Sequence, residues 1–240
     1  MDKLLSQLTA KLQAAFGERL VSVVLYGSAA AGDHHQDFSD LNVLCVLTQI
    51  TPRELAASED IFRWWREQGS PSPLLLTEHE LTTSTDSFAI EFHDIQRQNR
   101  LLHGRDVISA LEIDDSFYRA QVEHELRAKL LRLRQKAGGM LSNPDLLRRL
   151  LLDSISTFCV LFRHALYLKG HNAPFVKRDV IQLAREVFSF DPGPFNQLLD
   201  VREGARKPRE LDPVPLLASY LSEISRVIDA VDSIHKGVLP

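Results

Sequence analysis

The sequence is poor in sulfur-containing residues and in tryptophan, with only two cysteines, two methionines and two tryptophans among 240 residues. Cys45 and Cys159 each lie in an apolar run, which predicts small buried side chains. Two well-separated cysteines provide neither a disulfide framework nor the paired spacing of a zinc site. A membrane-spanning run of about 18 apolar residues is also missing, because Asp153 and Arg163 interrupt the strongest candidate. The sequence therefore predicts no structural zinc and no membrane partner.

Positive charge is not in excess either. Lysine and arginine number 28 against 32 aspartate and glutamate residues, which gives a net charge of -4. This balance offers no general attraction to nucleic acid, so any anionic ligand must be held by a local site. Residues 1–13 alternate polar and apolar side chains at helical spacing, unlike the continuous apolar core of a signal peptide. We expect a cytoplasmic protein that does not have nucleic acid as its partner.

The N-terminal part of the chain mixes helix and strand patterns. The leucines from Leu4 to Leu12, followed by Phe16, form a helical stripe that Gly17 can close. Thr51 and Glu54 have the capping-box spacing of a helix start. Four short apolar runs are expected to form strands: 21–26, 40–47, 72–77 and 88–92. This part is predicted to be a short mixed sheet with flanking helices.

From about residue 114 the strand signals stop, and helical spacing continues through the rest of the chain. Shorter or flanking helices are expected over 114–136, 177–188, 194–201 and 214–234. A long helix is expected over 144–168, with these side chains facing the core: Leu147, Leu151, Ile155, Phe158, Phe162 and Ala165. The predicted fold class is therefore α/β (α+β) in residues 1–110, followed by an all-α helical bundle in residues 111–240.

The segment 21–47 carries the pattern most typical of a binding site. An apolar strand runs directly into Gly27 and Ser28, and a second strand begins at Asp40. A glycine at a strand end lets the backbone approach a ligand closely, and the turn offers N–H groups and the Ser28 hydroxyl to phosphate oxygens. Asp40 and Asn42 are two residues apart, so their side chains share one face of a strand. A carboxylate on that face can hold Mg²⁺ against a triphosphate, because Mg²⁺ prefers oxygen ligands.

Two better-known phosphate-binding motifs do not fit this turn. Gly27 and Gly32 have the spacing of a P-loop, but Asp33 stands where the P-loop lysine belongs and would repel phosphate. The glycines do not form the G-x-G-x-x-G pattern of dinucleotide-binding domains either. A plain turn with an incidental glycine and serine, without any ligand, stays open as an alternative.

The Gly-Ser turn followed by an acidic strand resembles the signature of the polymerase-beta-like nucleotidyltransferase superfamily, of the antibiotic and minimal nucleotidyltransferase type with a C-terminal helical domain. In that family the Gly-Ser precedes a variable loop, an Asp-x-Asp strand and a further acid on a later strand. Gly27 and Ser28 match the Gly-Ser, Asp40 matches the first aspartate, and Glu91 matches the later acid. Asn42 departs from the family pattern, which has aspartate there. The resemblance implies a nucleotidyltransferase-type mixed sheet followed by a helical bundle.

The resemblance also implies a reaction, which is the transfer of a nucleoside monophosphate from a nucleoside triphosphate to a hydroxyl of a small molecule. It assigns catalytic roles to Asp40 and Glu91, and nucleotide binding to Gly27 and Ser28. Mg²⁺ is the implied cofactor, held by Asp40, Asn42 and Glu91. The turn and Asp40 are expected to face one cleft, with Glu91 near Asp40. The amide of Asn42 brings no charge to the metal, so we expect it to impair the activity.

Other functions stay open. A non-catalytic nucleotide-binding or regulatory relative is the main alternative, and Asn42 favours it. An antitoxin-like module that modifies or sequesters a protein partner is a third reading, which the fused helical part disfavours. The acceptor is unknown, and a homodimer is compatible with the sequence. A basic run from Arg127 to Lys136 is expected to be a solvated helix face or to line the triphosphate site.

Overall fold

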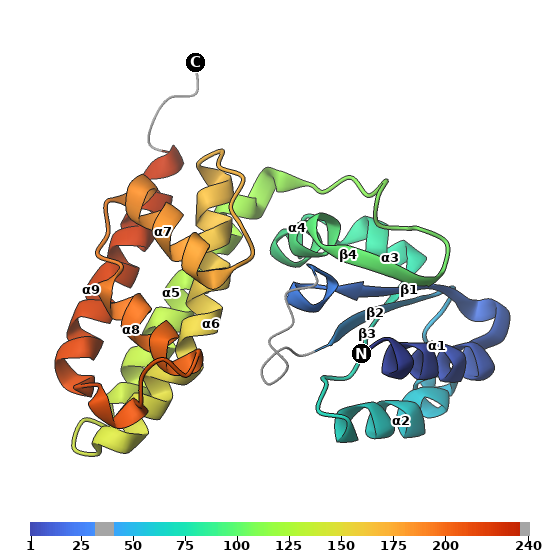
Figure 1. Cartoon of the computed structure of the whole chain (residues 1–240). Helices are drawn as coiled ribbons and strands as arrows, with labels where there is room; N and C mark the ends of the chain where they lie inside the picture. Colours follow the sequence, from blue (N-terminus) through green and yellow to red (C-terminus); the bar gives the residue numbers. More distant parts are fainter. Residues whose placement is uncertain (32–40, 236–240) are drawn as a thin grey trace. The chain divides into compact units, whose positions relative to one another are not determined.

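The computed structural model describes residues 1–31 and 41–235, without the side chains of residues 28, 31 and 235 (Figure 1). The chain divides into two compact units, Met1–Tyr118 and Arg119–Pro240. The first, which we name the sheet unit, combines a mixed sheet with helices, and the second, the helical unit, contains no strand among its described residues. The predicted fold class, α/β followed by all-α, is confirmed.

The sheet unit is built on a four-stranded sheet in the order β3-β2-β1-β4. The strands are β1 (Leu20–Tyr26), β2 (Asn42–Leu47), β3 (Leu74–Thr77) and β4 (Asn99–Gly104). β1 pairs antiparallel with β2 and β4, whereas β2 and β3 run parallel. Tyr26, the last residue of β1, lies opposite Asn42 on one side and Asn99 on the other. The C-terminal end of β1 therefore meets the first residues of two neighbouring strands.

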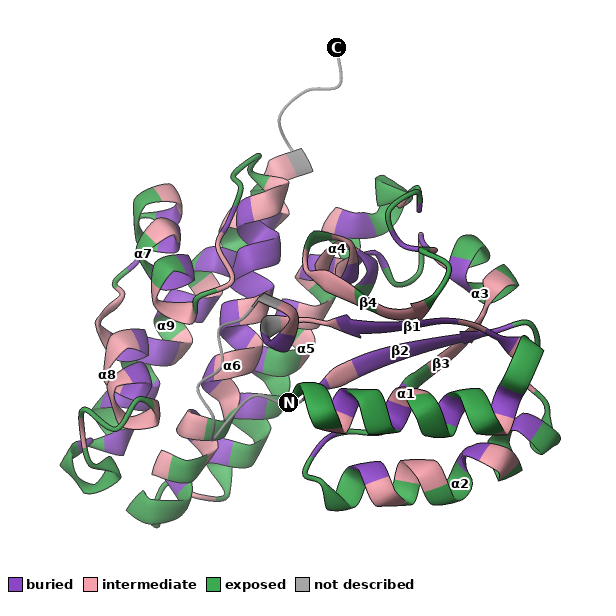
Figure 2. Cartoon of the chain, turned by 45° about the vertical axis from the view of Figure 1, so that its right-hand side comes forward, coloured by how far each residue is buried: buried purple, intermediate pink, exposed green. Residues whose placement is uncertain are grey.

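Helices cover both faces of this sheet. α1 (Asp2–Phe16) and α2 (Pro52–Glu67) lie on one face, and α3 (Glu78–Thr83) and α4 (Ala89–Arg97) lie on the other (Figures 1 and 2). Successive residues of a strand point to opposite faces, so each strand contributes to two cores. Val23, Leu25 and Cys45 pack with α1 and α2, while Val24, Leu44 and Phe92 belong to the core under α3 and α4.

The helical unit contains α5 (Tyr118–Gly138), α6 (Pro144–Leu168), α7 (Lys177–Phe188), α8 (Gly193–Arg202) and α9 (Pro213–Asp232). α6 is its central element and packs against α7, α8 and α9. All six residues of α6 that were predicted to face the core are buried. Aromatic side chains fill this core: the Phe162 and Phe195 ring centroids lie 5.2 Å apart, and those of Phe195 and Tyr220 lie 4.8 Å apart.

By length and composition alone, α6 could cross a membrane, but a core helix of a globular domain passes the same test. In the apolar stretch of α6, 56% of the residues are buried inside the protein. Cys159 lies on this helix, as Cys45 lies on β2, and both are buried without a disulfide. Burial raises the pKa of each thiol to about 12. The expectation of small buried cysteines is confirmed.

One predicted element of the sheet unit is wrong, and one strand was not predicted. The expected strand over 88–92 is the start of helix α4, whose buried residues Ala89, Phe92 and Ile95 recur every third position. A short apolar run does not distinguish strand from helix, which explains the error. β4 was not predicted, because its side chains are only partly buried and its apolar pattern is weak. The strand expected over 40–47 is described from Asn42 as β2, and Asp40 lies outside the described residues.

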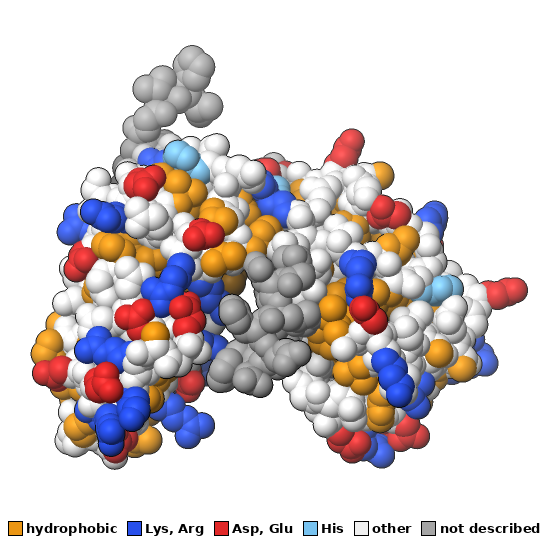
Figure 3. Space-filling view, in the orientation of Figure 1, with side chains coloured by type: hydrophobic (Ala, Val, Ile, Leu, Met, Phe, Trp, Pro, Cys, Tyr) orange, Lys and Arg blue, Asp and Glu red, His pale blue; other side chains and the backbone are white. Residues whose placement is uncertain are grey.

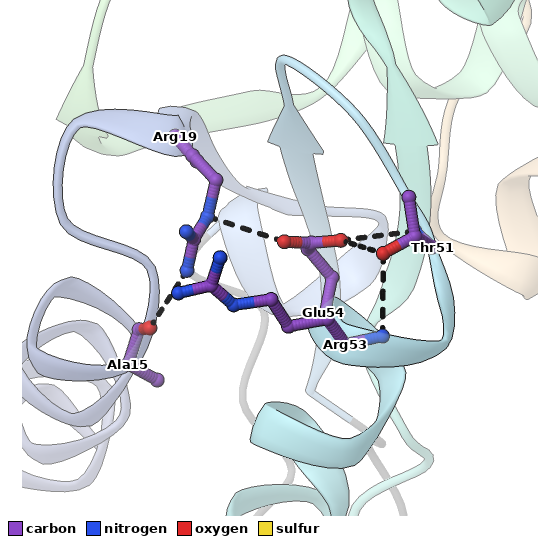
Figure 4. A network of polar contacts seen from close by, with 5 residues as sticks. All are labelled: Ala15, Arg19, Thr51, Arg53 and Glu54. Carbon is purple, nitrogen blue, oxygen red and sulfur yellow. Dashed lines mark hydrogen bonds and ion pairs between the residues drawn. The ribbon is translucent and has the colours of Figure 1, made fainter.

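An ion pair joins the partly exposed Arg19, in the turn after α1, to the buried Glu54 at the start of α2 (Figure 4). Glu54 is completely buried, and its carboxylate accepts a hydrogen bond of 3.0 Å from the Thr51 N–H, which completes the predicted capping box. Arg19 Nε lies 3.3 Å from the other carboxylate oxygen, and the Arg19 guanidinium also donates to the Ala15 carbonyl at 3.4 Å. The carboxylate therefore connects α2 to the segment that leads into β1.

Glu54→Gln is expected to lower the melting temperature at neutral pH and to have little effect in acid. Hydrogen bonds from Thr51, with a smaller contribution from the Arg19 charge, hold the pKa of Glu54 below its usual range. A depressed carboxylate pKa stabilises the fold above the unfolded-state pKa of about 4.3, and this stability is lost as the pH falls through the folded pKa. Thermal unfolding of both proteins from pH 7 to pH 3 measures the difference between their melting temperatures. A difference that does not become smaller in acid would contradict this account.

Candidate functional site

The predicted phosphate-binding turn directly follows β1. Gly27 has a φ of 78°, a left-handed conformation that favours glycine. Its N–H donates to the Gln98 carbonyl at 3.1 Å, and the Ala30 N–H donates back to the Gly27 carbonyl at 2.9 Å. These bonds leave the N–H groups of residues 28 and 29 without a backbone acceptor among the described residues. The turn is thus fixed in a form that can offer N–H donors, while the Ser28 side chain lies outside the described part.

Asn42, the first residue of β2, lies beside this turn. A Cβ atom added to Gly27 would lie 3.5 Å from Asn42 Nδ2, an ordinary contact, so the positive φ rather than space is what favours glycine. Asn42 is directly opposite Tyr26, and directly opposed residues of an antiparallel pair share one face of the sheet. That face also carries Leu44 and is the one covered by α4. The predicted partner of Asn42, Asp40, lies outside the described residues.

Glu91 reaches the same region from a helix instead of a strand. It is exposed in the first turn of α4. Burial raises the pKa of Tyr26, and the negative charge of Glu91 raises it further. The Glu91 carboxylate is therefore close enough to Tyr26 to act on it electrostatically. A carboxylate in the first turn of a helix also interacts favourably with the helix dipole, which is a structural reason for an acid at this position.

His93 does not join this group. Strand alternation would place His93 on the same face as Glu91, but on a helix the two side chains point about 200° apart. His93 Nε2 instead lies 2.6 Å from Asp115 Oδ1, and the His93 ring packs on Tyr118 with centroids 4.6 Å apart. His93 therefore connects α4 to the last residues of the sheet unit, Asp115 and Tyr118.

The residues at this end of the sheet include Gly27, Tyr26, Asn42, Asn99 and, through its charge, Glu91. Within the described ranges no three histidine, cysteine or acidic side chains lie close enough together to hold a metal ion. The described oxygen donors include the Asn42 amide and the Glu91 carboxylate, which are of the type that Mg²⁺ binds. The predicted Mg²⁺ site therefore depends on Asp40, and it stays a prediction.

Three basic side chains whose shared role sequence reasoning missed act electrostatically on one buried thiol in the helical unit. The charges of Lys177, Arg163 and Arg202, in that order, act on the buried thiol of Cys159 and oppose the effect of its burial. Arg163 is buried and its guanidinium carbon lies 4.2 Å from the centre of the Phe175 ring. Burial lowers the pKa of Lys177, and the positive charge of Arg202 lowers it further, while the charges of the Cys159 thiolate and Glu203 oppose this shift.

Lys177 is also the first residue of α7, where the helix dipole is positive and the N-cap residue Val176 provides no side-chain cap. A helix N-terminus with nearby cations suits a phosphate or carboxylate, although Asp179 in the same first turn already places one negative charge there. The sequence signal that could have found this cluster is a lysine in a helical first turn, where acidic residues are favoured. Arg163, Lys177 and Arg202 come from α6, α7 and α8, so their convergence depends on tertiary packing.

No protein-family model matches the sequence, and no curated protein sequence matches it. Among solved structures, the chain is similar to spectinomycin adenyltransferase AAD(9) from Enterococcus faecialis, solved with ATP and spectinomycin. The TM-score is 0.63 at 13% identity, and the match covers 97% of this chain and 99% of the adenyltransferase. A toxin–antitoxin structure with AMP-PNP matches 42% of this chain and 73% of that chain, at 17% identity with a TM-score of 0.30. The first of these similarities confirms the predicted fold: the chain shares with this adenyltransferase a nucleotidyltransferase-type mixed sheet with flanking helices, followed by a helical region.

Proposed function

We propose that the protein is a nucleotidyltransferase, which moves a nucleoside monophosphate from a nucleoside triphosphate to a hydroxyl of a small molecule. The observation that carries this proposal is the Gly27 turn beside Asn42, in a chain that shares almost its whole fold with an adenyltransferase solved with ATP and a small molecule. A turn with a positive φ, in which the N–H groups of residues 28 and 29 have no backbone acceptor among the described residues, suits phosphate oxygens.

The proposed roles follow from the chemistry of each side chain. The N–H groups of residues 28 and 29 and the Ser28 hydroxyl would bind phosphate oxygens, and Asp40 would be the main metal ligand with the Asn42 amide oxygen beside it. Mg²⁺, when bound there, would neutralise charge on the triphosphate. The acceptor hydroxyl oxygen would bond to the α-phosphorus as the bond to the β-phosphate breaks, releasing pyrophosphate. Glu91 would take the hydroxyl proton.

In the helical unit, the cluster of Lys177, Arg163 and Arg202 offers a second set of donors to an anion. We propose that it binds an anionic group. Arginine and lysine both bind phosphate strongly, and the positive end of the α7 dipole adds to the charge of Lys177.

A nucleotide-binding protein without transfer activity is the second candidate, and Asn42 favours it. The amide can still bind a metal ion through its oxygen, but it carries no charge to offset the metal. The two candidates share nucleotide binding and differ in whether pyrophosphate is released when a hydroxylated acceptor is supplied.

Asp40→Asn is expected to weaken Mg²⁺-dependent ATP binding by about 10- to 100-fold or more, because the main charged ligand of the metal is lost. Isothermal titration with each nucleoside triphosphate, with Mg²⁺ and with a chelator, measures this effect. Asp60→Asn is the matched control, since Asp60 is exposed on α2 and loses the same charge. Pyrophosphate release with a panel of hydroxylated molecules then separates transfer from binding. If no triphosphate binds the unchanged protein, the proposed function is wrong.

A further inference from the structure

A groove runs between α5 and α6 in the helical unit. On α5, Lys129, Arg132 and Lys136 recur at helical spacing and line one wall. On α6, Asp153 and Thr157 lie one turn apart on the other wall. The cavity between the walls has a volume of about 170 Å³, which suits a small molecule and not a polymer. Neither the proposed transfer reaction nor the Lys177 cluster uses these residues.

The basic run of α5 divides into side chains that are neutralised and side chains that are not. Arg127 donates to Glu123 at 2.7 Å, and Lys129 pairs with Glu125 at 3.1 Å. Arg132 and Lys136 have no acidic partner in the part of the chain that the structure describes. Arg132 and Lys136 are one helical turn apart and both line the groove, so their positive charges act together on a ligand there.

The opposite wall carries one acidic side chain. Asp153 is the acid of the groove, and Arg149 lies 3.9 Å from its carboxylate. The Thr157 hydroxyl makes no hydrogen bond within the described residues, so it can donate to a ligand. Ser154 is held in place by bonds of 2.8 Å to the Leu151 carbonyl and 3.2 Å to the Tyr220 hydroxyl. The groove thus presents two unneutralised cations and one free hydroxyl.

The floor of the groove is apolar. Leu133 and Phe158 are buried beneath it, and Leu150 is half-buried at its side. Over the face drawn in Figure 3, lysine and arginine side chains are mixed with acidic ones and do not form the continuous basic surface that nucleic acid requires. A ligand that matches this groove is small, with an anionic group at one end and an apolar body at the other.

We propose that this groove is a binding site for a small organic phosphate, a phosphoryl group attached to a compact apolar body. A phosphate monoester carries about -1.5 to -2 charges at neutral pH, which matches the two cations Arg132 and Lys136 better than a carboxylate does. Arg132 can donate two parallel hydrogen bonds to phosphate oxygens, Lys136 adds a point charge, and Thr157 adds a hydroxyl donor. The apolar body would lie on Leu133 and Phe158. The site is independent of nucleotidyl transfer.

Phenyl phosphate is the probe, and isothermal titration is the measurement. The double variant Arg132→Gln/Lys136→Gln is expected to bind phenyl phosphate at least about 10-fold more weakly than the unchanged protein, because two charge-assisted contacts are lost. The matched control is Arg127→Gln/Arg134→Gln, which removes the same charge from α5, where Arg127 pairs with Glu123 and Arg134 donates to Ser225 at 3.3 Å. The affinity of the control variant for phenyl phosphate is expected to stay within about twofold of that of the unchanged protein. Circular dichroism of both variants shows that each is folded.

Five further ligands test the chemistry of the site. Inorganic phosphate lacks the apolar body and benzyl alcohol lacks the charge, so both are expected to bind more weakly than phenyl phosphate. If benzoate bound as tightly as phenyl phosphate, the choice of a phosphate over a carboxylate would be wrong. An equal loss of ATP affinity in the Arg132→Gln/Lys136→Gln variant would assign the groove to the nucleotide instead. The proposal would be wrong if both double variants lost the same affinity for phenyl phosphate. It would also be wrong if the protein bound a single-stranded oligonucleotide more tightly than phenyl phosphate.

Discussion

Asn42→Asp is expected to tighten ATP binding in the presence of Mg²⁺ by about 10- to 100-fold, the range by which metal sites respond to changes in their ligand environment. Asn42 lies beside the Gly27 turn, on the face of the sheet that α4 covers. Aspartate and asparagine are nearly the same size, so the fold should tolerate the change. The new carboxylate adds a charged ligand for a metal that the triphosphate itself needs.

The sign of the effect should reverse when the metal is removed. With a chelator present, the added carboxylate repels the triphosphate, and Asn42→Asp should bind ATP more weakly than the unchanged protein. Isothermal titration of both proteins under both conditions gives four affinities. Asn196→Asp on α8 makes the same chemical change in the helical unit and controls for net charge. The same Mg²⁺ dependence in Asn42→Asp and in the unchanged protein would show that residue 42 does not face a metal.

Phe162→Ala is expected to lower the free energy of unfolding of the helical unit by about 3–5 kcal/mol. Phe162 is completely buried on α6, and its ring packs against Phe190 and Phe195 with centroids 5.8 and 5.2 Å away. Truncation removes the ring from the centre of the aromatic core and leaves a cavity that neighbouring rings cannot fill without moving. Denaturant unfolding followed by circular dichroism measures the change.

The matched control for Phe162→Ala is the same substitution at an exposed site. Phe117 is 59% exposed, so Phe117→Ala should change the free energy of unfolding by no more than about 0.5 kcal/mol. A loss of less than about 1 kcal/mol for Phe162→Ala would mean that the core rearranges to fill the space, contrary to the packing described.

The sequence predicted best those elements whose pattern is long and local. The stripe of α1 and the buried face of α6 repeat over several turns, so each was placed with the right side toward the core. The Gly27 turn was found because a strand running into glycine is a local signal. Short elements were predicted less well. The apolar run around Phe92 is too short to distinguish a strand from a helix, and α4 was missed for that reason.

Features that depend on tertiary packing were not visible in the sequence. Arg163, Lys177 and Arg202 are separated along the chain and meet only when α6, α7 and α8 pack together. The α5–α6 groove likewise needs two helices, and from sequence the basic run of α5 could not be divided into neutralised and free side chains. At the candidate site, Gly27, Asn42 and Glu91 are located, while the role of Asp40 stays a prediction.

Because each unit contains one buried cysteine, the reactivity of the two thiols can report the order in which the units unfold. Cys45 lies in the sheet unit and Cys159 in the helical unit, and burial raises the pKa of each to about 12. Only the thiolate reacts with alkylating reagents, so both sulfurs should be inert while the chain is folded. Brief exposure to iodoacetamide during partial denaturation, followed by mass spectrometry of the peptides, should therefore reveal which unit loses its structure first. No label has to be introduced, because each unit already carries its own.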